Sequence, residues 1–319
     1  MKRTFRRRVA AAAAALALSI PALAVESVKI LIPASPGGGW DTTGRELGKA
    51  MTAAGSAKSI QYDNKGGAGG TIGLAQFVNV AKGDPGAMMM TGMVMVGGIV
   101  MNKSPVNLSQ TTPIARLMSE YEVIVVPASG PKTLKELLEK FKANPGSVSW
   151  GGGSAGGVDH ILAGMLAQAV GVEGSKVNYV PFKGGGEATS AIIGGHVTAG
   201  ISGYGEFAQH IQSGKMRALA ISSAKRIPGI NIPTIKEQGY DVELANWRGI
   251  VGAPGITKAQ RDELVKAVEA TVKSKQWQET LKKQEWDDFY LAGDGFATYI
   301  DSEMKRLGTV LGGLALGGK

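Results

Sequence analysis

Short apolar runs alternate with amphipathic stretches along most of this 319-residue chain, and clusters of glycine separate many of them. Residues 87–91 form a continuous apolar run, as expected of a strand buried on both faces of a parallel sheet. Residues 28–32 read as an earlier strand, and residues 42–54 and 71–81 between these strands have the composition of helices. The pattern predicts an α/β fold in which parallel strands are joined by helices.

The same order of elements occurs twice in the sequence. Strand, glycine loop, helix, strand, a Lys-Gly-Gly sequence, helix and strand follow one another over residues 28–91 and again over residues 148–201. The Lys-Gly-Gly sequence itself recurs, at Lys65 and Lys183. We interpret this as two lobes of similar construction and not as a solenoid of many units.

We expect the chain to pass between the two lobes more than once. Two separate strands are predicted, at residues 112–117 and 122–126, and the sequence Pro-Ala-Ser-Gly-Pro that begins at Pro127 is the best candidate for a hinge. A second hinge is expected in the return strands near residues 241–247. The predicted division is a discontinuous first lobe and a continuous second lobe, formed by residues 25–126 with 241–319 and by residues 127–240.

Three glycine-rich loops are the main candidates for chemistry, and each follows a predicted strand and precedes a predicted helix. They lie at residues 37–42, 150–160 and 180–188. The first N–H groups of a helix lack an intrahelical acceptor and lie at the positive end of its dipole, so such loops favour anions. Ligands of doubly wound sheets also bind beyond the carboxyl ends of the strands. We therefore expect the loops to close together on a small carboxylate.

The first 24 residues have the pattern of a secretory signal peptide, which places the expected protein in the periplasm. A basic stretch at residues 2–8 precedes an apolar segment at residues 9–20, which is too short to span a bilayer, and Ala-Leu-Ala at residues 22–24 is a typical cleavage site. This leader carries five basic residues and no acidic one, so its removal lowers the formal net charge from +9 to +4. No cluster of basic and aromatic residues remains, and nucleic acid is not an expected partner.

Two motifs suggest enzymes instead. Gly152 to Gly156 fits the G-x-S-x-G elbow of serine hydrolases around Ser154, and His196 and His210 follow in the sequence as potential bases, so a hydrolase stays an open alternative. The dinucleotide fingerprint at the same loop lacks the acidic residue that should end the next strand. The chain has no cysteine, and its histidines and carboxylates do not have metal-ligand spacing, so no metal or cofactor is expected.

Six motifs together resemble the extracytoplasmic solute receptors of the tripartite tricarboxylate transporter family, also called Bug or TctC proteins. The motifs are IPASPGGGWD (32–41), NKGGAGGTIG (64–73), GGGSAGGVDH (151–160), VPFKGGGEA (180–188), ALAISSAKR (218–226) and WRGIVGAPG (247–255). The resemblance covers essentially all of the chain after the leader. It implies a type II periplasmic binding protein, a two-lobed Venus flytrap in which each lobe is a sheet flanked by helices, and not an enzyme.

The resemblance also implies a ligand and a partner. Members of this family hold a small carboxylate largely through backbone amides of the glycine loops, and they deliver it to the permease subunits of a membrane transporter. Trp40-Asp41 and residues 246–249 look closer to the TctC-like branch, which favours citrate or a related tricarboxylate or dicarboxylate. We expect a monomer. A receptor that serves a signalling pathway stays an open alternative.

The predicted ligand-binding residues come from the glycine loops and the neighbouring strand ends. Trp40 fits either a pocket wall or a hydrophobic staple, and Asp41 fits an N-cap better than an acid catalyst. Lys183 fits either a counter-charge or a solvated side chain, and Ser154 a hydroxyl donor to the anion. The full set is Gly37, Gly38, Gly39, Trp40, Asp41, Thr42, Gly69, Thr91, Ser154, Ala155, Gly156, Gly157, His160, Lys183, Gly184, Gly185 and Ser202.

Overall fold

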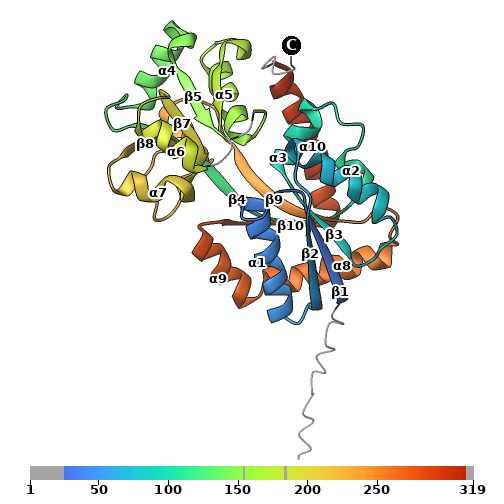
Figure 1. Ribbon diagram of the computed structural model, residues 1–319. Coiled ribbons are helices and arrows are strands. Elements are labelled where there is room, and N and C mark those ends of the chain that lie inside the picture. Colours follow the sequence, from blue (N-terminus) through green and yellow to red (C-terminus); the bar gives the residue numbers. More distant parts are fainter. Residues whose placement is uncertain (1–24, 154, 183–184, 314–319) are drawn as a thin grey trace, which may run out of the picture.

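The computed structural model describes residues 25–153, 155–182 and 185–313, which form two α/β lobes (Figure 1). In the first lobe, three strands lie in the order β2-β1-β3, and they are parallel because α1 and α2 return the chain to the same end of the strands each time. The elements of this unit are β1 (Val25–Ile32), α1 (Gly39–Ala53), β2 (Ala57–Asn64), α2 (Thr71–Val80), β3 (Ala87–Gly92) and α3 (Met93–Met101).

The second lobe repeats this arrangement, which confirms the predicted α/β architecture with two similarly built units. Its three parallel strands lie in the order β6-β5-β7, the counterpart of β2-β1-β3. Two further helices and a further strand complete the lobe. The elements are α4 (Leu134–Ala143), β5 (Ser149–Gly152), α5 (Val158–Ala169), β6 (Asn178–Pro181), α6 (Gly185–Ile193), β7 (Ala199–Gly203), α7 (Tyr204–Gln212) and β8 (Met216–Ile221).

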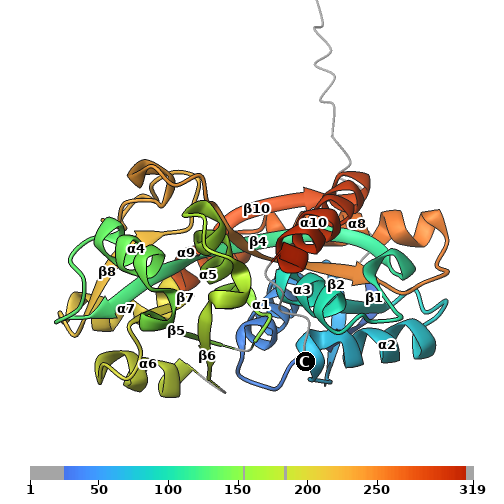
Figure 2. The same ribbon diagram turned by 90° about the horizontal axis from the view of Figure 1, so that it is seen from above.

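Two long strands connect the lobes, and here the prediction of short separate strands was wrong. Residues 112–127 form one continuous strand, β4 (Thr112–Pro127), which pairs with β9 (Ala245–Gly252) up to Tyr121 and with β7 and β8 from Glu122 onward. Figures 1 and 2 show β4 running from one lobe into the other. Both β4 and β9 are antiparallel to their neighbours, so the sheet is mixed and not purely parallel. The division into lobes at residues 126 and 240 stays a prediction.

The C-terminal segment packs on the first lobe. Helix α8 (Lys258–Val272) and helix α9 (Lys275–Gln284) contact α1, and α10 (Gly293–Gly313) contacts α3, while β10 (Asp287–Ala292) pairs with β4. The sequence pattern does not predict helix α9, which starts directly after α8 because the Ser274 side chain accepts a hydrogen bond from the Trp277 N–H and caps it.

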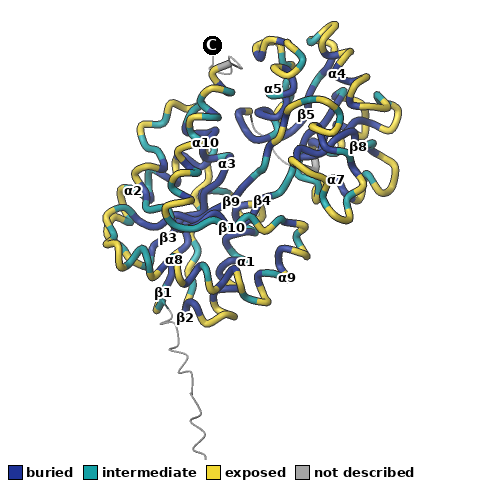
Figure 3. The backbone as a smooth tube through the Cα atoms, turned by 180° about the vertical axis from the view of Figure 1, so that it is seen from behind, coloured by how far each residue is buried: buried dark blue, intermediate teal, exposed yellow. Residues whose placement is uncertain are grey.

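The strands at the centre of each lobe carry its core (Figure 3). Met88, Met89 and Met90 of β3 have no exposed surface, which agrees with the interpretation of this apolar run as a fully covered strand. None of the helices in the described ranges combines the length and the apolar character needed to cross a membrane.

Candidate functional site

A cavity of about 730 Å³ lies where the glycine loops of the two lobes meet the connecting strands. A smaller hollow of about 350 Å³ shares Gly39, Glu120, Gly203, Glu206 and Arg248 with it, so the two are parts of one cleft. The described residues that line the larger part are Gly39, Val94, Glu120, Glu122, Gly153, Ala155, Gly157, Val158, Asp159, Pro181, Phe182, Ala188, Ser202, Gly203, Glu206, Asn246 and Arg248.

The first predicted loop reaches this cleft through the start of α1. The helix begins at Gly39, and Gly38 stands at the N-cap position with extended backbone and no side-chain cap. Within the described chain, no group accepts a hydrogen bond from the N–H of Gly39 or Trp40. A Cβ atom on Gly39 would overlap the guanidinium group of Arg248, so glycine at this position lets Arg248 lie against the helix start.

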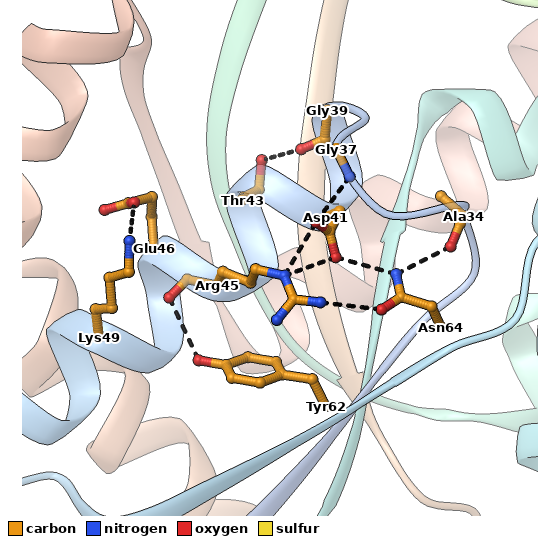
Figure 4. Close-up of polar contacts among 10 residues, drawn as sticks. All are labelled: Ala34, Gly37, Gly39, Asp41, Thr43, Arg45, Glu46, Lys49, Tyr62 and Asn64. Carbon is orange, nitrogen blue, oxygen red and sulfur yellow. Dashed lines mark hydrogen bonds and ion pairs between the residues drawn. The ribbon is translucent and has the colours of Figure 1, made fainter.

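Asp41 fixes the shape of this loop, and its predicted role as an N-cap was wrong (Figure 4). It is the third residue of α1, and its carboxylate accepts hydrogen bonds from Gly37 N (2.9 Å), Arg45 Nε (2.9 Å) and Asn64 Nδ2 (3.0 Å). Burial alone would raise the pKa of Asp41, but these hydrogen bonds outweigh it and lower the pKa to about 2. The N–H of Gly37 is therefore engaged within the loop and does not point to a ligand.

Three other predicted residues of the first lobe do not line the cleft, and two of them, Trp40 and Thr91, are buried in the lobe. The indole ring of Trp40 is 8% exposed and packs where Gly70 and Gly92 leave space for it, so the structure favours a core role over a pocket wall. Thr91 is fully buried, and its hydroxyl donates to Met95 Sδ at 3.4 Å. Gly69 packs against α3. Gly37 and Thr42, by contrast, line the smaller part of the cleft.

The second predicted loop contributes the start of α5 to the same cavity. Gly157 is the N-cap of α5 in extended conformation, and Ala155, Gly157 and Val158 line the cavity. The carboxylate of Asp159 accepts a hydrogen bond from Gly153 N at 2.6 Å, so the N–H of Gly153 is engaged within its own loop, as in the first lobe. Among the described residues, the N–H of Val158 has no acceptor.

His160 positions this loop and does not line the cavity. Its Nδ1 accepts a hydrogen bond from Gly156 N (3.1 Å), and its ring stacks on Tyr179 with the ring centroids 4.1 Å apart. Burial lowers the pKa of His160 to about 4, so the ring is neutral at pH 7.

Ser154, Lys183 and Gly184 lie outside the described residues, and Gly185 is the first residue of α6.

Most charged groups of the cleft were missed by the sequence interpretation, although two of the listed motifs contain Arg248 and Asp159. Arg248 on β9 is 7% exposed; it forms an ion pair with Glu120 and donates to Thr43 Oγ1 at 3.1 Å. Asn246 Nδ2 donates to Glu120 Oε1 (3.0 Å) and to Glu122 Oε1 (3.1 Å). The side chains of β4 at the point where it changes lobes therefore meet β9 inside the cleft.

The second lobe adds two more acidic groups to this cleft. Ser202, a predicted site residue, lines the cavity and donates to Glu206 Oε2 at 2.9 Å. Burial, together with the charge of Asp159, raises the pKa of Glu122 well above its usual range, and burial raises the pKa of Asp159 to about 6. Within the described ranges, no group of three or more His, Cys, Asp or Glu side chains has the arrangement of a metal site.

Comparison with the sequences of known proteins assigns this chain to a family. The family model described as "Tripartite tricarboxylate transporter family receptor" matches residues 46–316. A UPF0065 protein of Agrobacterium vitis is 29% identical over 255 residues, which cover 77% of this chain and 71% of that protein. Protein BugT of Bordetella pertussis is 26% identical over 255 residues, which cover 77% of this chain and 76% of that protein.

Solved structures with a similar fold include periplasmic binding proteins of the same family. The periplasmic binding protein BugD is 26% identical with a TM-score of 0.75, and the match covers 92% of this chain and 99% of that one. MatC of Rhodopseudomonas palustris, solved with bound malate, is 22% identical with a TM-score of 0.75 over 90% and 99% of the two chains. R. palustris Rpa4515, solved with adipate, is 21% identical with a TM-score of 0.76 over 91% and 97%.

These matches agree with the two-lobed α/β architecture and with the resemblance carried by the glycine-loop motifs. The chain therefore belongs to the tripartite tricarboxylate transporter receptor family and is a periplasmic solute-binding receptor of the TctC/Bug type.

Proposed function

We propose that the cleft binds a small carboxylate and that the closed, ligand-bound protein delivers it to the permease subunits of a tripartite tricarboxylate transporter. The observation that carries the proposal is that the N-termini of α1 and α5 line one cavity together with Arg248. A helix N-terminus stabilises an anion by about 0.3–1 kcal/mol, and by up to about 2 kcal/mol where it is partly buried. Two such ends from different lobes favour a carboxylate most when the lobes close on it.

Closure requires a hinge, which we place where the two long strands cross between lobes. Strand β4 changes its pairing partners between Tyr121 and Glu122, and β9 begins at Ala245 beside it. Glu120, Glu122 and Asn246 lie beside these crossing points and line the cavity, so a small change in backbone angles there would move the loops of one lobe relative to the other. This refines the hinge predicted near Pro127.

The identity of the carboxylate is the finer part of the proposal. Citrate is one candidate, but half of its sequence support came from Trp40, and that side chain packs in the core. The relatives solved with malate and with adipate support a dicarboxylate. Acidic side chains at Glu120, Glu122 and Glu206 also disfavour a trianion in this cavity. We therefore rank a dicarboxylate above citrate.

Binding, and not catalysis, is the proposed activity. In the hydrolase alternative the candidate bases are His196 and His210, and neither is among the described residues that line the two parts of the cleft. We expect the wild type and the S154A variant to hydrolyse esters no faster than the background rate. We expect the substitution to change the affinity for a carboxylate no more than tenfold. Loss of a measurable esterase activity in this variant, with the fold intact, would support the hydrolase instead.

Calorimetry tests the binding proposal directly. The purified protein would be titrated with malate, succinate, adipate, citrate and the neutral succinamide. We expect saturable binding of at least one carboxylate and none of the amide. Binding of the amide alone would refute the proposal, whereas binding of dicarboxylates and citrate with equal affinity would refute only the ranking.

Mass analysis of the periplasmic protein is expected to show the loss of residues 1–24, and light scattering is expected to show a monomer.

A further inference from the structure

We propose that helix α3 provides the surface on which the second lobe closes, and that Gly97 of this helix sets how tightly the closed protein holds its ligand. Gly97 is a positioning residue, because it is not among the described residues that line either part of the cleft. The role rests on the proposed function, since it assumes that binding and closure are coupled. It adds the contact between the lobes that binding must form.

One face of α3 points towards the second lobe. Val94, Gly97 and Met101 are three and four residues apart, so their positions share one face of the helix. Val94 lines the cavity, and the next two positions of this face lie against Gly156 of the second glycine loop. Helices α3 and α10 both contact α5 (Figure 2). The two lobes therefore meet directly beside the wall of the cavity.

The crowding at Gly97 comes from the second lobe. A Cβ atom on Gly97 would lie 3.0 Å from the carbonyl oxygen of Gly156 and 3.4 Å from Ile161 Cδ1. Apart from α3 itself, no described atom of the first lobe lies within 4 Å of this Cβ position. Glycine inside a helix is less favourable than alanine. The first lobe by itself thus gives no reason for a glycine here, whereas the close approach of the second lobe accounts for it.

Gly98, the next residue of α3, packs within its own lobe instead. A Cβ atom on Gly98 would lie 3.0 Å from the carbonyl oxygen of Gly69 and 3.1 Å from that of Ala68. Both oxygens belong to the segment between β2 and α2, which is part of the first lobe. The two glycines are similarly crowded, Gly98 by its own lobe and Gly97 by the other.

The second lobe presents fixed backbone at this contact. Gly156 has a φ of 76°, which glycine adopts far more readily than other residues, and its N–H donates to His160 Nδ1 at 3.1 Å. A Cβ atom on Gly156 would lie 3.0 Å from Met101 Cγ, so α3 approaches this residue closely as well. Backbone held in this way cannot turn aside as a long side chain could. Added bulk at Gly97 therefore pushes the lobes apart.

The contact forms and breaks as the lobes move, because the chain joins the lobes through β4 and β9 and not through α3. A ligand held between the lobes favours the closed arrangement. The apparent affinity falls in proportion to the closed fraction when a substitution opposes closure. A change at Gly97 thus lowers the affinity although its side chain does not reach the ligand.

Calorimetry of G97A and G97V with malate and with adipate measures the effect on affinity. Overpacking of the contact is expected to weaken binding about 5- to 100-fold, with valine the more disruptive of the two. The unfolding temperature of the ligand-free variants should not fall, because alanine and valine favour a helix over glycine. A permanent contact predicts the reverse, namely less stable ligand-free variants with unchanged affinity. That result would refute the role of Gly97.

Two other glycine substitutions serve as matched controls. G98A adds the same methyl group one residue away, where the crowding lies within the first lobe, so it should lower the unfolding temperature and leave the affinity unchanged. G308A, inside α10, adds a methyl group with no described atom within 4 Å, so it should raise the unfolding temperature and leave the affinity unchanged. An equal loss of affinity in G308A and G97A would overturn the role of the α3 contact.

The separation of the lobes can be measured directly, because the chain has no cysteine and spin labels attach only where one is introduced. N79C in α2 and E139C in α4 are exposed positions, one on each lobe. Pulsed electron–electron double resonance is expected to show short and long distances in the ligand-free wild-type background, and adipate should favour the short one. The G97V background should show the long distance. Equal distance distributions in the two backgrounds would refute the proposed contact.

The possible outcomes separate this inference from the proposed function. If the wild type binds no carboxylate, the proposed function is refuted, and the ligand-free distances still decide whether Gly97 controls the lobes. If the wild type and G97V bind equally well, the receptor function stands and the role of Gly97 is refuted. Thermal unfolding checks that G97V is folded, and G97A, which carries the smaller side chain, decides the matter if it is not.

Discussion

Replacing Asp41 by Asn tests the argument that one buried carboxylate holds the first glycine loop. Asp41 is 5% exposed, and it accepts hydrogen bonds from the loop at Gly37, from Arg45 in the next turn of α1 and from Asn64 at the end of β2. Asparagine has nearly the same shape. It loses the negative charge, however, and turns one acceptor oxygen into an NH₂ group that faces donors.

The size of the effect follows from the lowered pKa of Asp41. A change from 3.8 to about 2 corresponds to about 2 kcal/mol, because one pKa unit is worth about 1.4 kcal/mol. The folded-state pKa lies below the unfolded value, so this stabilisation is complete well above pH 4 and is lost as the pH falls towards 2. We expect D41N to unfold about 2 kcal/mol more easily than the wild type at pH 7, and the difference to shrink below pH 4.

Urea denaturation of the purified wild type and variant, followed by tryptophan fluorescence between pH 7 and pH 2.5, measures this difference. The matched control is D241N, because Asp241 is 96% exposed in its ion pair with Lys236, and such a pair contributes little. A difference below about 0.5 kcal/mol at pH 7 would refute the reasoning, since it is far smaller than the lowered pKa requires. So would a D41N difference that stays constant down to pH 2.5.

Three further changes probe the cleft and its support. R248M is expected to weaken dicarboxylate binding more than tenfold in calorimetry, and an unchanged affinity would remove Arg248 from the site. H160F should cost about 1 kcal/mol in urea denaturation, because the Gly156 N–H loses its acceptor. The wild type, whose His160 pKa is lowered to about 4, should also lose stability between pH 6.5 and pH 4 through this group, a loss absent from H160F. G92A should lower stability by about 1–3 kcal/mol, because the new Cβ would lie 2.6 Å from the Trp247 carbonyl oxygen; an unchanged melting temperature would contradict this.

The local order of elements was predictable because the apolar runs and the glycine loops carry it directly. The repeat of strand, loop, helix and strand appears in the structure as the matching strand orders β2-β1-β3 and β6-β5-β7. Cap residues also carry a strong local signal: the Thr133 hydroxyl accepts the Glu136 N–H at the start of α4. In these places the sequence within one or two turns decides the structure.

The strand that joins the lobes was not predictable in the same way. The polar sequence Met-Ser-Glu-Tyr-Glu at residues 118–122 interrupts the apolar pattern, and such an interruption usually ends a strand. In the structure the strand continues, and Glu120 and Glu122 turn into the cleft, where β9 supplies Asn246 and Arg248. Polar residues occupy this part of β4 because their side chains line the cleft. Their partners on β9 lie more than 120 positions away in the sequence, so the local pattern does not reveal this role.

Trp40 illustrates the same limit at the scale of one side chain. Its position after three glycines fitted both a ligand and a core role, and the choice depends on Gly70 and Gly92, which leave room for its ring. Neither glycine is near Trp40 in the sequence. Packing between distant segments therefore decided what the local pattern left open.

The loops combine two uses of backbone N–H groups, and the division between them explains how a glycine-rich site can be selective. The N–H groups of Gly37, Gly153 and Gly156 are engaged by Asp41, Asp159 and His160 from the helices that follow, so each loop is held by the helix that it precedes. The N–H groups at the starts of α1 and α5 stay available at the cavity. Glycine supplies the close approach, and the side-chain acceptors remove the freedom that glycine would otherwise give the loop. A site ordered in advance loses less entropy on binding, which is what a receptor needs if its affinity is to come from a few backbone contacts.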